Sequence, residues 1–324
     1  MLRQLLSIHA KTSALDEQKL RTGFYNVTRD RFPRILIFNQ MQTDPIHNEI
    51  LAYIARHRFV TIRDLSHGLG LSKNTLTSPL TVLLGRRYIS REELSRRGLK
   101  GGRTPFVYRI ERQGILQLKR TGILHSIPIQ HQQYHAKNES KSHALLITGF
   151  QAMAESSMRE HRDRSFLDEF QIKQQIYGTP KQLTWPVTVN FKNKEATFRV
   201  IPDAVFGKLN ETDDSVEYFF LEADRGTMPI NPKTSDRSSL AKKVAAYHAS
   251  YQRQLCTHHL GLPGFRVIFV VPTRARLLSL VSLCSQFRNG RGIFLLVDEK
   301  TYHDHHNLFD IPFISGSGRT RYIT

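Results

Sequence analysis

The sequence predicts a protein of mixed helix and sheet, in the α+β or α/β class, with two domains. Its 324 residues exceed what one small hydrophobic core requires, and 40% of them are hydrophobic, which is enough to fill two cores. Apolar residues recur with helical spacing in some segments and form short strand-like runs in others. We predict a basic arm over residues 1–43, a first domain over 44–121, a linker over 122–141 and a second domain over 142–324.

The chain is strongly basic. Lysine and arginine total 47 against 28 aspartates and glutamates, which gives a net charge of +19 and a pI near 10.1. Such a charge predicts a polyanionic partner, of which nucleic acid is the commonest. No apolar run approaches the roughly 20 residues that span a membrane, and the first residues lack the apolar core and cleavage site of a secretory signal. We therefore expect a cytoplasmic protein that binds double-stranded DNA and no membrane.

Three helices are predicted at the start of the first domain. Asp44 and Pro45 are typical of an N-cap and a first helical position, and the helix that they open ends near His57. A second, short helix covers residues 61–68 and leads into a tight turn. Ser72 then caps a third helix. Two short helices separated by such a turn have the spacing of a helix-turn-helix.

The third helix is the expected recognition helix, which would read base edges in the major groove. Leucines on one side of it face inward, and short polar side chains lie near its start. Pro79 falls inside the helix and predicts a bend. The residues predicted to contact DNA from this helix are Ser72, Lys73, Asn74, Thr75 and Thr77.

Two strand-like segments, 88–94 and 106–110, follow and are joined by a basic, glycine-rich loop. This pattern is typical of the wing of a winged helix-turn-helix, and a closing helix is predicted over 111–121. Residues 86–120 contain eleven lysines and arginines against three glutamates. A solvated charged face is the plainer explanation, but the charge falls on the loop that the fold would direct at DNA phosphates. The predicted phosphate contacts are Arg86, Arg87, Arg96, Arg97, Lys100 and Arg103.

The second domain is predicted to alternate helices and strands around a mixed sheet. The strand that ends at Glu222 is almost continuously apolar, as expected for a central strand covered on both faces. The predicted elements are a helix over 142–160, strands over 170–177, 196–206 and 216–224, a helix over 238–255, a strand over 265–271, a helix over 274–287 and a strand over 292–297.

Two of these strand-like runs carry carboxylates, Asp203 in the segment 201–206 and Glu222 in the segment 218–226. Paired carboxylates on neighbouring strands are a common way to hold a catalytic divalent metal. Mg²⁺ prefers hard oxygen ligands and keeps several waters, so few protein ligands are needed. We predict Asp203, Glu222 and the backbone carbonyl of Ala223 as ligands of Mg²⁺ or Mn²⁺.

These motifs, in this order, resemble the restriction-endonuclease-like fold of the PD-(D/E)XK nucleases. They are more similar to the bacterial replication-relaxation family of plasmid and mobile-element proteins, in which a winged helix precedes a domain with a Pro-Asp-Ala strand and a Glu-x-Asp-Arg-Gly strand. The resemblance covers roughly residues 44–275 and rests on Pro202-Asp203-Ala204, on Glu222-Ala223-Asp224-Arg225-Gly226-Thr227 and on Lys243-x-x-x-Tyr247. It implies a DNA-binding protein that acts in replication, mobilisation or their regulation. Winged helices usually act on symmetric sites as dimers, so a homodimer and partner proteins of the mobile element are both candidate assemblies.

The resemblance also implies a lysine that orients water and stabilises the transition state. Its usual place, two residues after the glutamate, is occupied by Asp224. Lys243, beside the apolar stripe of the following helix, is the candidate replacement. Two hypotheses follow: a Mg²⁺-dependent DNA endonuclease that uses Asp203, Glu222 and Lys243, or a non-catalytic module in which Arg225 pairs with Asp203 or Asp224.

Other side chains near these motifs receive plainer interpretations. Glu155 or Glu160 of the predicted helix could join the site, although solvated helix charge explains either one. His143 could orient a carboxylate, but we interpret it as a satisfied core residue. Tyr247 is predicted to pack in the core.

The wing generates a testable prediction. Replacing Arg96, Arg97, Lys100 and Arg103 with alanine should weaken binding to all duplex sequences, because phosphate contacts carry no sequence information. The slope of log affinity against log salt should fall by about 0.9 for each phosphate that these side chains no longer neutralise. An unaltered slope would show that these wing residues do not contact DNA phosphates.

Overall fold

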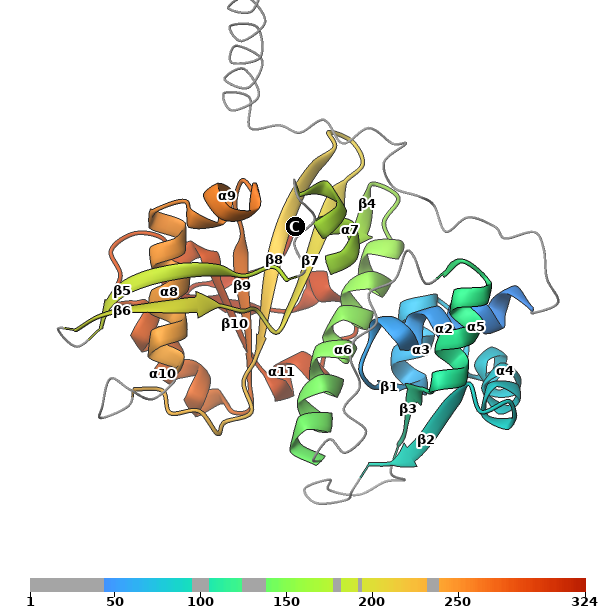
Figure 1. Cartoon of the computed structure of the whole chain (residues 1–324). Helices are drawn as coiled ribbons and strands as arrows, with labels where there is room; N and C mark the ends of the chain where they lie inside the picture. The colour runs from blue at the N-terminus through green and yellow to red at the C-terminus, as the bar shows by residue number, and fades with distance from the viewer. Residues whose placement is uncertain (1–43, 95–104, 124–137, 177–181, 192–193, 232–238) are drawn as a thin grey trace, which may run out of the picture.

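The computed structural model describes residues 44–94, 105–123, 138–176, 182–191, 194–231 and 239–324 (Figure 1). The elements form an N-terminal unit, residues 44–123, and a C-terminal unit, residues 138–324. The predicted arm over residues 1–43 and most of the predicted linker lie outside the described residues. The N-terminal unit contains α2 (Pro45–Arg56), β1 (Val60–Thr61), α3 (Ile62–Leu69), α4 (Lys73–Gly85), β2 (Ile89–Glu93), β3 (Phe106–Ile110) and α5 (Arg112–Arg120).

Local capping fixes the first three helices where the sequence predicts them. The Asp44 side chain accepts a hydrogen bond from the N–H of Ile46 at 3.2 Å, and Pro45 opens α2. A capping box joins Thr61 and Asp64 at the start of α3. The Ser72 hydroxyl caps α4 by accepting the N–H of Thr75 at 3.1 Å. Helix α4 then continues through its internal proline to Gly85.

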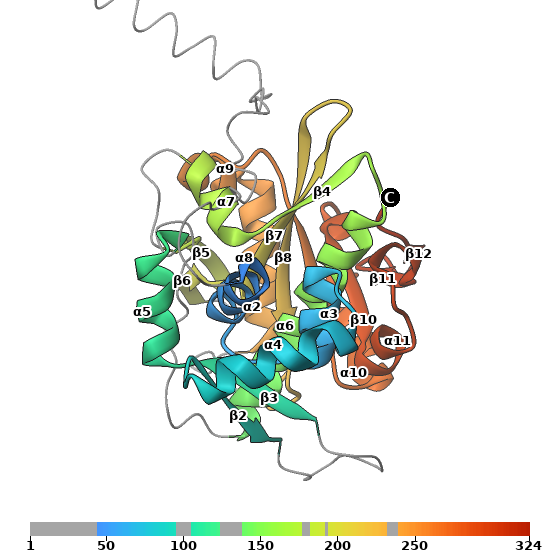
Figure 2. The same ribbon diagram turned by 90° about the vertical axis from the view of Figure 1, so that its right-hand side faces the viewer.

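The N-terminal unit is closed by a small antiparallel sheet in the order β1-β3-β2. Its core consists of buried hydrophobic side chains, aliphatic for the most part, from α2, β1, α3, α4, β2, β3 and α5. The core faces of α3 and α4 pack together, and α4 lies on the side of the unit away from the C-terminal unit, with α3 between (Figure 2). Residues 95–104, the predicted wing loop, lie outside the described residues.

The C-terminal unit is built around a mixed seven-stranded sheet within the described residues, in the order β12-β11-β10-β9-β8-β7-β4. Strand β7 is antiparallel to β4 and β8, whereas β8, β9 and β10 are parallel to one another. A separate two-stranded hairpin, β5-β6, lies against α8. The elements are α6 (Asn138–Arg159), β4 (Arg164–Leu167), α7 (Glu169–Gln175), β5 (Trp185–Phe191), β6 (Lys194–Val200), β7 (Ala204–Asn210), β8 (Ser215–Ala223), α8 (Leu240–Gln252), α9 (Leu255–Leu260), β9 (Arg266–Val271), α10 (Arg274–Cys284), η3 (Arg291–Ile293), β10 (Phe294–Asp298), α11 (Glu299–His303), η4 (Leu308–Asp310), β11 (Phe313–Ser315) and β12 (Thr320–Arg321).

Alternate residues of the central strands face two different hydrophobic cores. On β8, Phe219 and Leu221 pack with α6 and α11, whereas Phe220 packs with α8, α10 and the β5-β6 hairpin. Because successive strand side chains point to opposite faces, both faces of β8 are covered. The prediction of a central strand is therefore confirmed.

Two predicted strands are wrong. The segment predicted as a strand over 170–177 forms helix α7, which a capping box at Asp168 and Gln171 opens and whose Ile172 is buried; the buried Ile176 follows the helix in an extended conformation. The segment predicted as one strand over 196–206 is divided between β6 and β7, which belong to different sheets. Strands β4, β5, β11 and β12 and helix α11 were not predicted.

Helix α6 joins the two units. At its C-terminal end, Arg159 donates to the carbonyl oxygens of His67, at 2.9 Å, and Gly68, which end α3. Arg56 of α2 pairs with Asp168 at 3.0 Å and with Glu155 of α6 at 3.8 Å. The interpretation of Glu155 as solvated helix charge is therefore wrong, because its side chain is 19% exposed and holds the two units together.

Glu160, the other candidate carboxylate, immediately follows α6. Its carboxylate accepts a hydrogen bond from the side chain of Asn307 at 3.0 Å, and it is exposed. Neither Glu155 nor Glu160 lines the cavity that contains Asp203 and Glu222.

Among the described residues, no helix combines the length and apolarity that a membrane crossing needs.

Two glycines of the N-terminal unit give a matched test of its packing. A methyl group on Gly114 would collide with the backbone carbonyl of Tyr88, whereas one on Gly85 would meet nothing within 4 Å. We expect Gly114→Ala to destabilise the protein by about 1–3 kcal/mol. Gly85→Ala, at the last residue of α4, should stabilise it by up to about 1 kcal/mol. Equal melting temperatures for the two variants would contradict this packing.

Candidate functional site

Asp203 is held at the end of strand β8 by two hydrogen bonds. It immediately precedes β7, and its N–H donates to the carbonyl oxygen of Leu221 at 3.0 Å. Its carboxylate accepts the N–H of Ala223 at 2.9 Å. Since Ala204 is paired with Leu221 in the β7-β8 register, Asp203 lies next to Glu222.

Glu222 lies on β8 and is 2% exposed. Its carboxylate forms an ion pair with Lys243, and it accepts the hydroxyl of Tyr247 at 2.6 Å. Both partners come from α8, where they are four residues apart and so share one face. The Ser239 hydroxyl caps this helix by accepting the N–H of Lys242 at 3.2 Å. The predicted arrival of Lys243 from the following helix is confirmed.

Tyr247 has a larger role than the sequence indicates. It is 1% exposed and packs with Trp185, Phe220 and Phe265, so the prediction of a core residue is confirmed. Its hydroxyl also orients the Glu222 carboxylate. The signal that could have revealed this is the spacing of four residues between Lys243 and Tyr247.

His143 approaches Asp203 from α6, which covers the face of the sheet opposite α8. It lies near the start of α6, and its Nε2 is 3.5 Å from Oδ1 of Asp203. Its side chain is 26% exposed. The interpretation of His143 as a satisfied core residue is therefore wrong, and the alternative, that it orients a carboxylate, fits the geometry.

The third carboxylate of the motif, Asp224, lines the same cavity but is paired with a different cation. Asp224 forms a bidentate ion pair with Arg276 of α10, with one N–O distance of 3.0 Å, and Arg276 also donates to the backbone carbonyl of Met228. Arg225 is exposed, and within the described part of the chain it pairs with neither Asp203 nor Asp224. The predicted pairing of Arg225 is wrong, because α10 supplies the partner that the sequence motif does not contain.

The charges in this cluster affect one another. Burial raises the pKa of Glu222 to about 7, and the nearby positive charge of Lys243 limits the rise. Burial also acts to raise the pKa of Asp203, but the hydrogen bond from His143 and the charge of Lys243 outweigh it and bring that pKa below its ordinary value. Lys243 loses hydration on burial, yet Glu222 and Asp203 raise its pKa, so it remains an ammonium ion.

The donor set has the chemistry that Mg²⁺ requires. Asp203 and Glu222 border a cavity of about 160 Å³, which Ala223 and Lys243 also line. Since the N–H and C=O of a strand residue face the same edge, the Ala223 carbonyl points to the side of Asp203, as its N–H does. Within the described ranges, no group of three or more His, Cys, Asp or Glu side chains could hold a metal. Mg²⁺ can be bound through one or two carboxylates with waters, so the two carboxylates and a carbonyl fit it.

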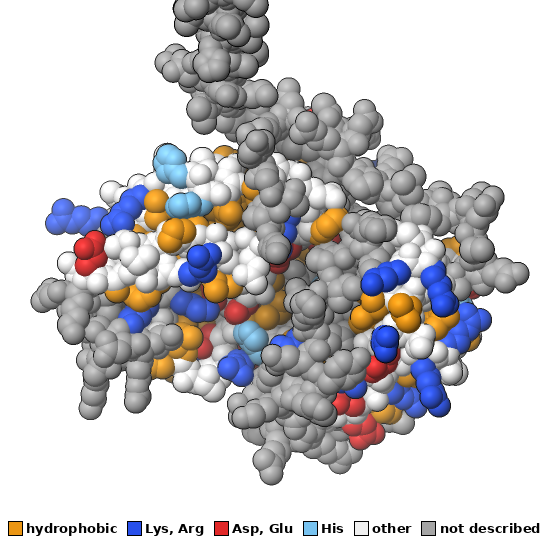
Figure 3. All heavy atoms as spheres, in the orientation of Figure 1, with side chains coloured by type: hydrophobic (Ala, Val, Ile, Leu, Met, Phe, Trp, Pro, Cys, Tyr) orange, Lys and Arg blue, Asp and Glu red, His pale blue; other side chains and the backbone are white. Residues whose placement is uncertain are grey.

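The predicted DNA-binding residues of α4 lie together on an exposed surface of the N-terminal unit. Figure 3 shows Lys and Arg side chains gathered over this unit. Arg86 and Arg87 follow α4 and are exposed. Arg96, Arg97, Lys100 and Arg103 lie outside the described residues. The exposed residues at the start of α4 are Ser72, Lys73, Asn74, Thr75 and Thr77.

Comparison with known families matches the sequence to one of them. The sequence model of replication-relaxation proteins matches residues 51–264, more than half of the chain. The chain belongs to the replication-relaxation family. The match includes helix α4 together with Asp203, Glu222 and Lys243, so both the exposed helix and the carboxylate site lie within the family's shared region. Neither the curated proteins nor the solved structures contain a match to this replication-relaxation protein.

The raised pKa of Glu222 predicts a pH-dependent stability. An ordinary glutamate has a pKa of about 4.3, so between that value and about 7 the folded state holds a proton that the unfolded state has lost. The stability that this proton supplies is full at low pH and is lost as the pH rises through 7. In metal-free buffer, the unfolding free energy of Glu222→Gln relative to wild type should therefore increase by roughly 3 kcal/mol between about pH 5 and pH 8.

The exposed Glu49 provides the control for this measurement. The difference between Glu49→Gln and wild type should stay nearly constant over the same range, as measured by chemical denaturation. A constant difference for Glu222→Gln as well would contradict the buried, proton-binding carboxyl.

Proposed function

We propose that this replication-relaxation protein binds double-stranded DNA through a winged helix and cleaves a DNA phosphodiester at Asp203, Glu222 and Lys243. The proposal includes a role in the replication or mobilisation of a plasmid or other mobile element, which membership of the family supports. One observation carries the nuclease activity: Lys243 reaches Glu222 from α8, beside Asp203. In the nuclease motif a lysine stands two residues after the glutamate, where this chain has Asp224. Lys243 supplies the positive charge that is missing from that position.

DNA binding is supported by the arrangement of the N-terminal unit. Helices α3 and α4 are joined by a tight turn in which Gly70 has a left-handed conformation, with φ of 67°. Helix α4 presents short polar side chains at its exposed start, as a recognition helix does. The hairpin β2-β3 follows, with the basic loop at its tip. We assign this unit as a winged helix and the C-terminal unit as a PD-(D/E)XK nuclease-like domain.

The residues of the site take distinct roles in the proposed cleavage. When bound to Asp203, Glu222 and the Ala223 carbonyl, Mg²⁺ or Mn²⁺ would neutralise charge on the scissile phosphate and lower the pKa of water. Lys243 stays protonated, so it stabilises negative charge at the phosphate rather than accepting a proton. Tyr247 holds the Glu222 carboxylate in place, and His143 does the same for Asp203.

A second candidate function is favoured by one observation. Glu222 is 2% exposed, and its two carboxylate oxygens already accept from Tyr247 and Lys243. A cluster closed in this way suits a non-catalytic DNA-binding protein, in which the ion pair only holds α8 against the sheet. Such a protein would act as a replication initiator, a mobilisation accessory or a regulator.

Incubation with supercoiled plasmid tests the two functions. We expect nicking that requires Mg²⁺ or Mn²⁺ and stops with EDTA. Asp203→Asn and Lys243→Met should each reduce the rate by roughly 100-fold or more, because each removes charge from the site of phosphate attack. Duplex affinity should remain close to that of wild type, since the winged helix is unaltered.

Asp213→Asn is the matched control, because this aspartate is fully exposed in the turn between β7 and β8. It should cleave like wild type. Plasmid binding without cleavage in both metals would overturn the nuclease proposal and favour the non-catalytic binder. Cleavage that survives in Asp203→Asn would show that the activity arises elsewhere.

A further inference from the structure

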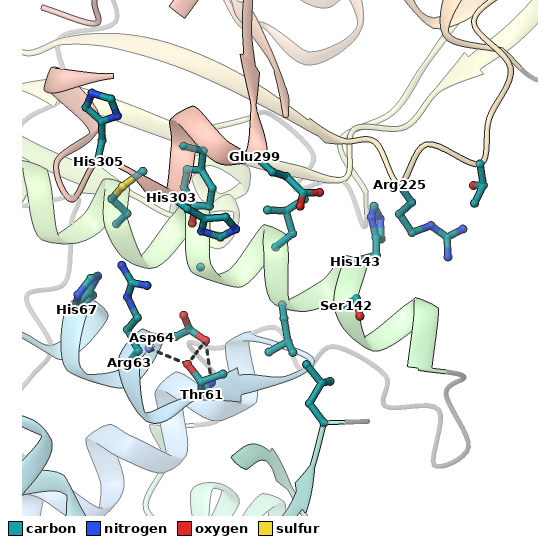
Figure 4. Close-up of a pocket in the computed structure, with 17 residues that line it drawn as sticks. Thr61, Arg63, Asp64, His67, Ser142, His143, Arg225, Glu299, His303 and His305 are labelled. Atoms are coloured by element: carbon teal, nitrogen blue, oxygen red, sulfur yellow. Dashed lines mark hydrogen bonds between the residues drawn. The ribbon is translucent and has the colours of Figure 1, made fainter. Parts of the chain in front are cut away.

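A second, larger cavity opens beside the carboxylate site. Its volume is about 550 Å³, and it lies between the N-terminal and C-terminal units (Figure 4). Helix α6 forms its floor, with α3 on one side and α11 on the other. His143, Arg225 and Thr227 line both this cleft and the smaller cavity, so the two lie side by side.

Positive charge is distributed along the cleft. Arg63, from α3, is exposed and extends into the space between the two units, and Arg225 is exposed at the end next to the carboxylate site. His67 and His305 lie at the other end. Guanidinium groups bind phosphate through paired N–H donors, so two of them along one path suit a nucleic-acid backbone.

The cleft also contains two carboxylates. Asp64 is 8% exposed, and its carboxylate accepts the N–H of Thr61 at 2.7 Å and the Thr61 hydroxyl at 2.8 Å, so it serves to cap α3. Glu299 is partly buried at the start of α11. Glu299 lines the cleft and is accessible in part, whereas Asp64 is buried, so two exposed arginines face one accessible carboxylate and the balance of accessible charge is positive.

The floor of the cleft is apolar. Leu145, Leu146 and Met153 of α6 line it, and Gly149 lies among them. A methyl group on Gly149 would come within 3.2 Å of the Tyr302 hydroxyl and 3.4 Å of the Asp64 carboxylate. A larger residue at this position would therefore make the cleft shallower. An apolar floor between cationic walls can accept the faces of unpaired bases while their phosphates meet the arginines.

Size selects a single strand over a duplex. Pockets of about 300–1,000 Å³ hold small molecules, so a cleft of about 550 Å³ accommodates one or two nucleotides. A duplex is far wider, since its major groove alone measures about 12 Å. Duplex DNA on α4 would lie on the outer side of the N-terminal unit, with α3 between it and the cleft.

We infer that the cleft between the two units binds a single-stranded DNA segment and leads it past Arg63 and Arg225 to Asp203 and Glu222. The inference rests on the proposed nuclease function and names its substrate class: DNA in which a single strand adjoins the duplex held by the winged helix. Strand separation next to the bound duplex would supply such a substrate.

Binding of a fluorescein-labelled oligothymidylate, measured by anisotropy in EDTA, tests the cleft without any cleavage. Arg63→Ala and Arg225→Ala should each weaken binding roughly tenfold, the effect expected of removing one charge-assisted hydrogen bond. Together they should lower the salt slope by about 1.4, which is about 0.7 for each single-strand phosphate that an arginine neutralises. Both side chains are exposed, and circular dichroism of the variants should match that of wild type.

Arg288→Ala is the matched control, because Arg288 is exposed and lines neither cavity. It should bind oligothymidylate like wild type, and duplex affinity should be unchanged in all three variants. Unchanged oligothymidylate affinity in Arg63→Ala and Arg225→Ala would overturn the inference. An equal reduction in Arg288→Ala, or an equal reduction of duplex affinity, would do so as well.

A cleavage experiment in Mg²⁺ separates this inference from the proposed function. Wild type should cut a duplex with a single-stranded tail faster than a blunt duplex, and the double arginine variant should lose that preference. Cleavage of both substrates at equal rates would refute the single-strand path and leave the nuclease standing. Tight oligothymidylate binding that depends on the two arginines, without any cleavage, would refute the nuclease alone.

Discussion

The ion pair between Glu222 and Lys243 is the interaction on which the C-terminal unit depends. A carboxylate buried in a largely apolar sheet is stable only if a partner and further hydrogen bonds compensate its lost hydration. Helix α8 supplies both, through Lys243 and Tyr247, and must therefore lie directly over β8. The same helix holds the β5-β6 hairpin, where the Trp185 indole donates to the Ser250 hydroxyl at 2.8 Å. One buried charge thus fixes a helix, a hairpin and the face of the sheet beneath them.

Helix α6 performs the corresponding task on the other side of the sheet. Its first turns contribute His143 to the carboxylate site, its middle forms the floor of the cleft, and its end contacts α2 and α3. The bonds from Arg159 reach carbonyls at the C-terminal end of α3, where the His67 carbonyl also accepts the N–H of Gly70 at 3.3 Å. Helix α6 therefore packs in the core of the C-terminal unit and also forms the surface against which the N-terminal unit rests.

The sequence predicts those features that local patterns determine. Caps at Asp44 and Ser72 and the continuous apolar run before Glu222 placed the helices and the central strand correctly, because each depends on residues a few positions apart. Arg276 was missed because it reaches Asp224 across 52 residues of sequence, from an element that carries no motif. His143 was misinterpreted for the same reason, since only the folded sheet brings α6 to Asp203. The helix α7 was mistaken for a strand because its segment is short and rich in residues with strand propensity.

The hydrogen bonds and ion pairs that hold α2 and α3 against α6 have a geometric consequence. Arg159 and Arg56 join the N-terminal unit to the C-terminal unit through bonds to backbone carbonyls and partly buried carboxylates, and these bonds resist rotation more than a flexible linker would. The distance between the exposed start of α4 and Asp203 is then a property of the folded protein, and under the proposed function it would fix how far from the bound base pairs cleavage occurs. A nuclease built in this way would measure a fixed length of DNA from the sequence that it recognises.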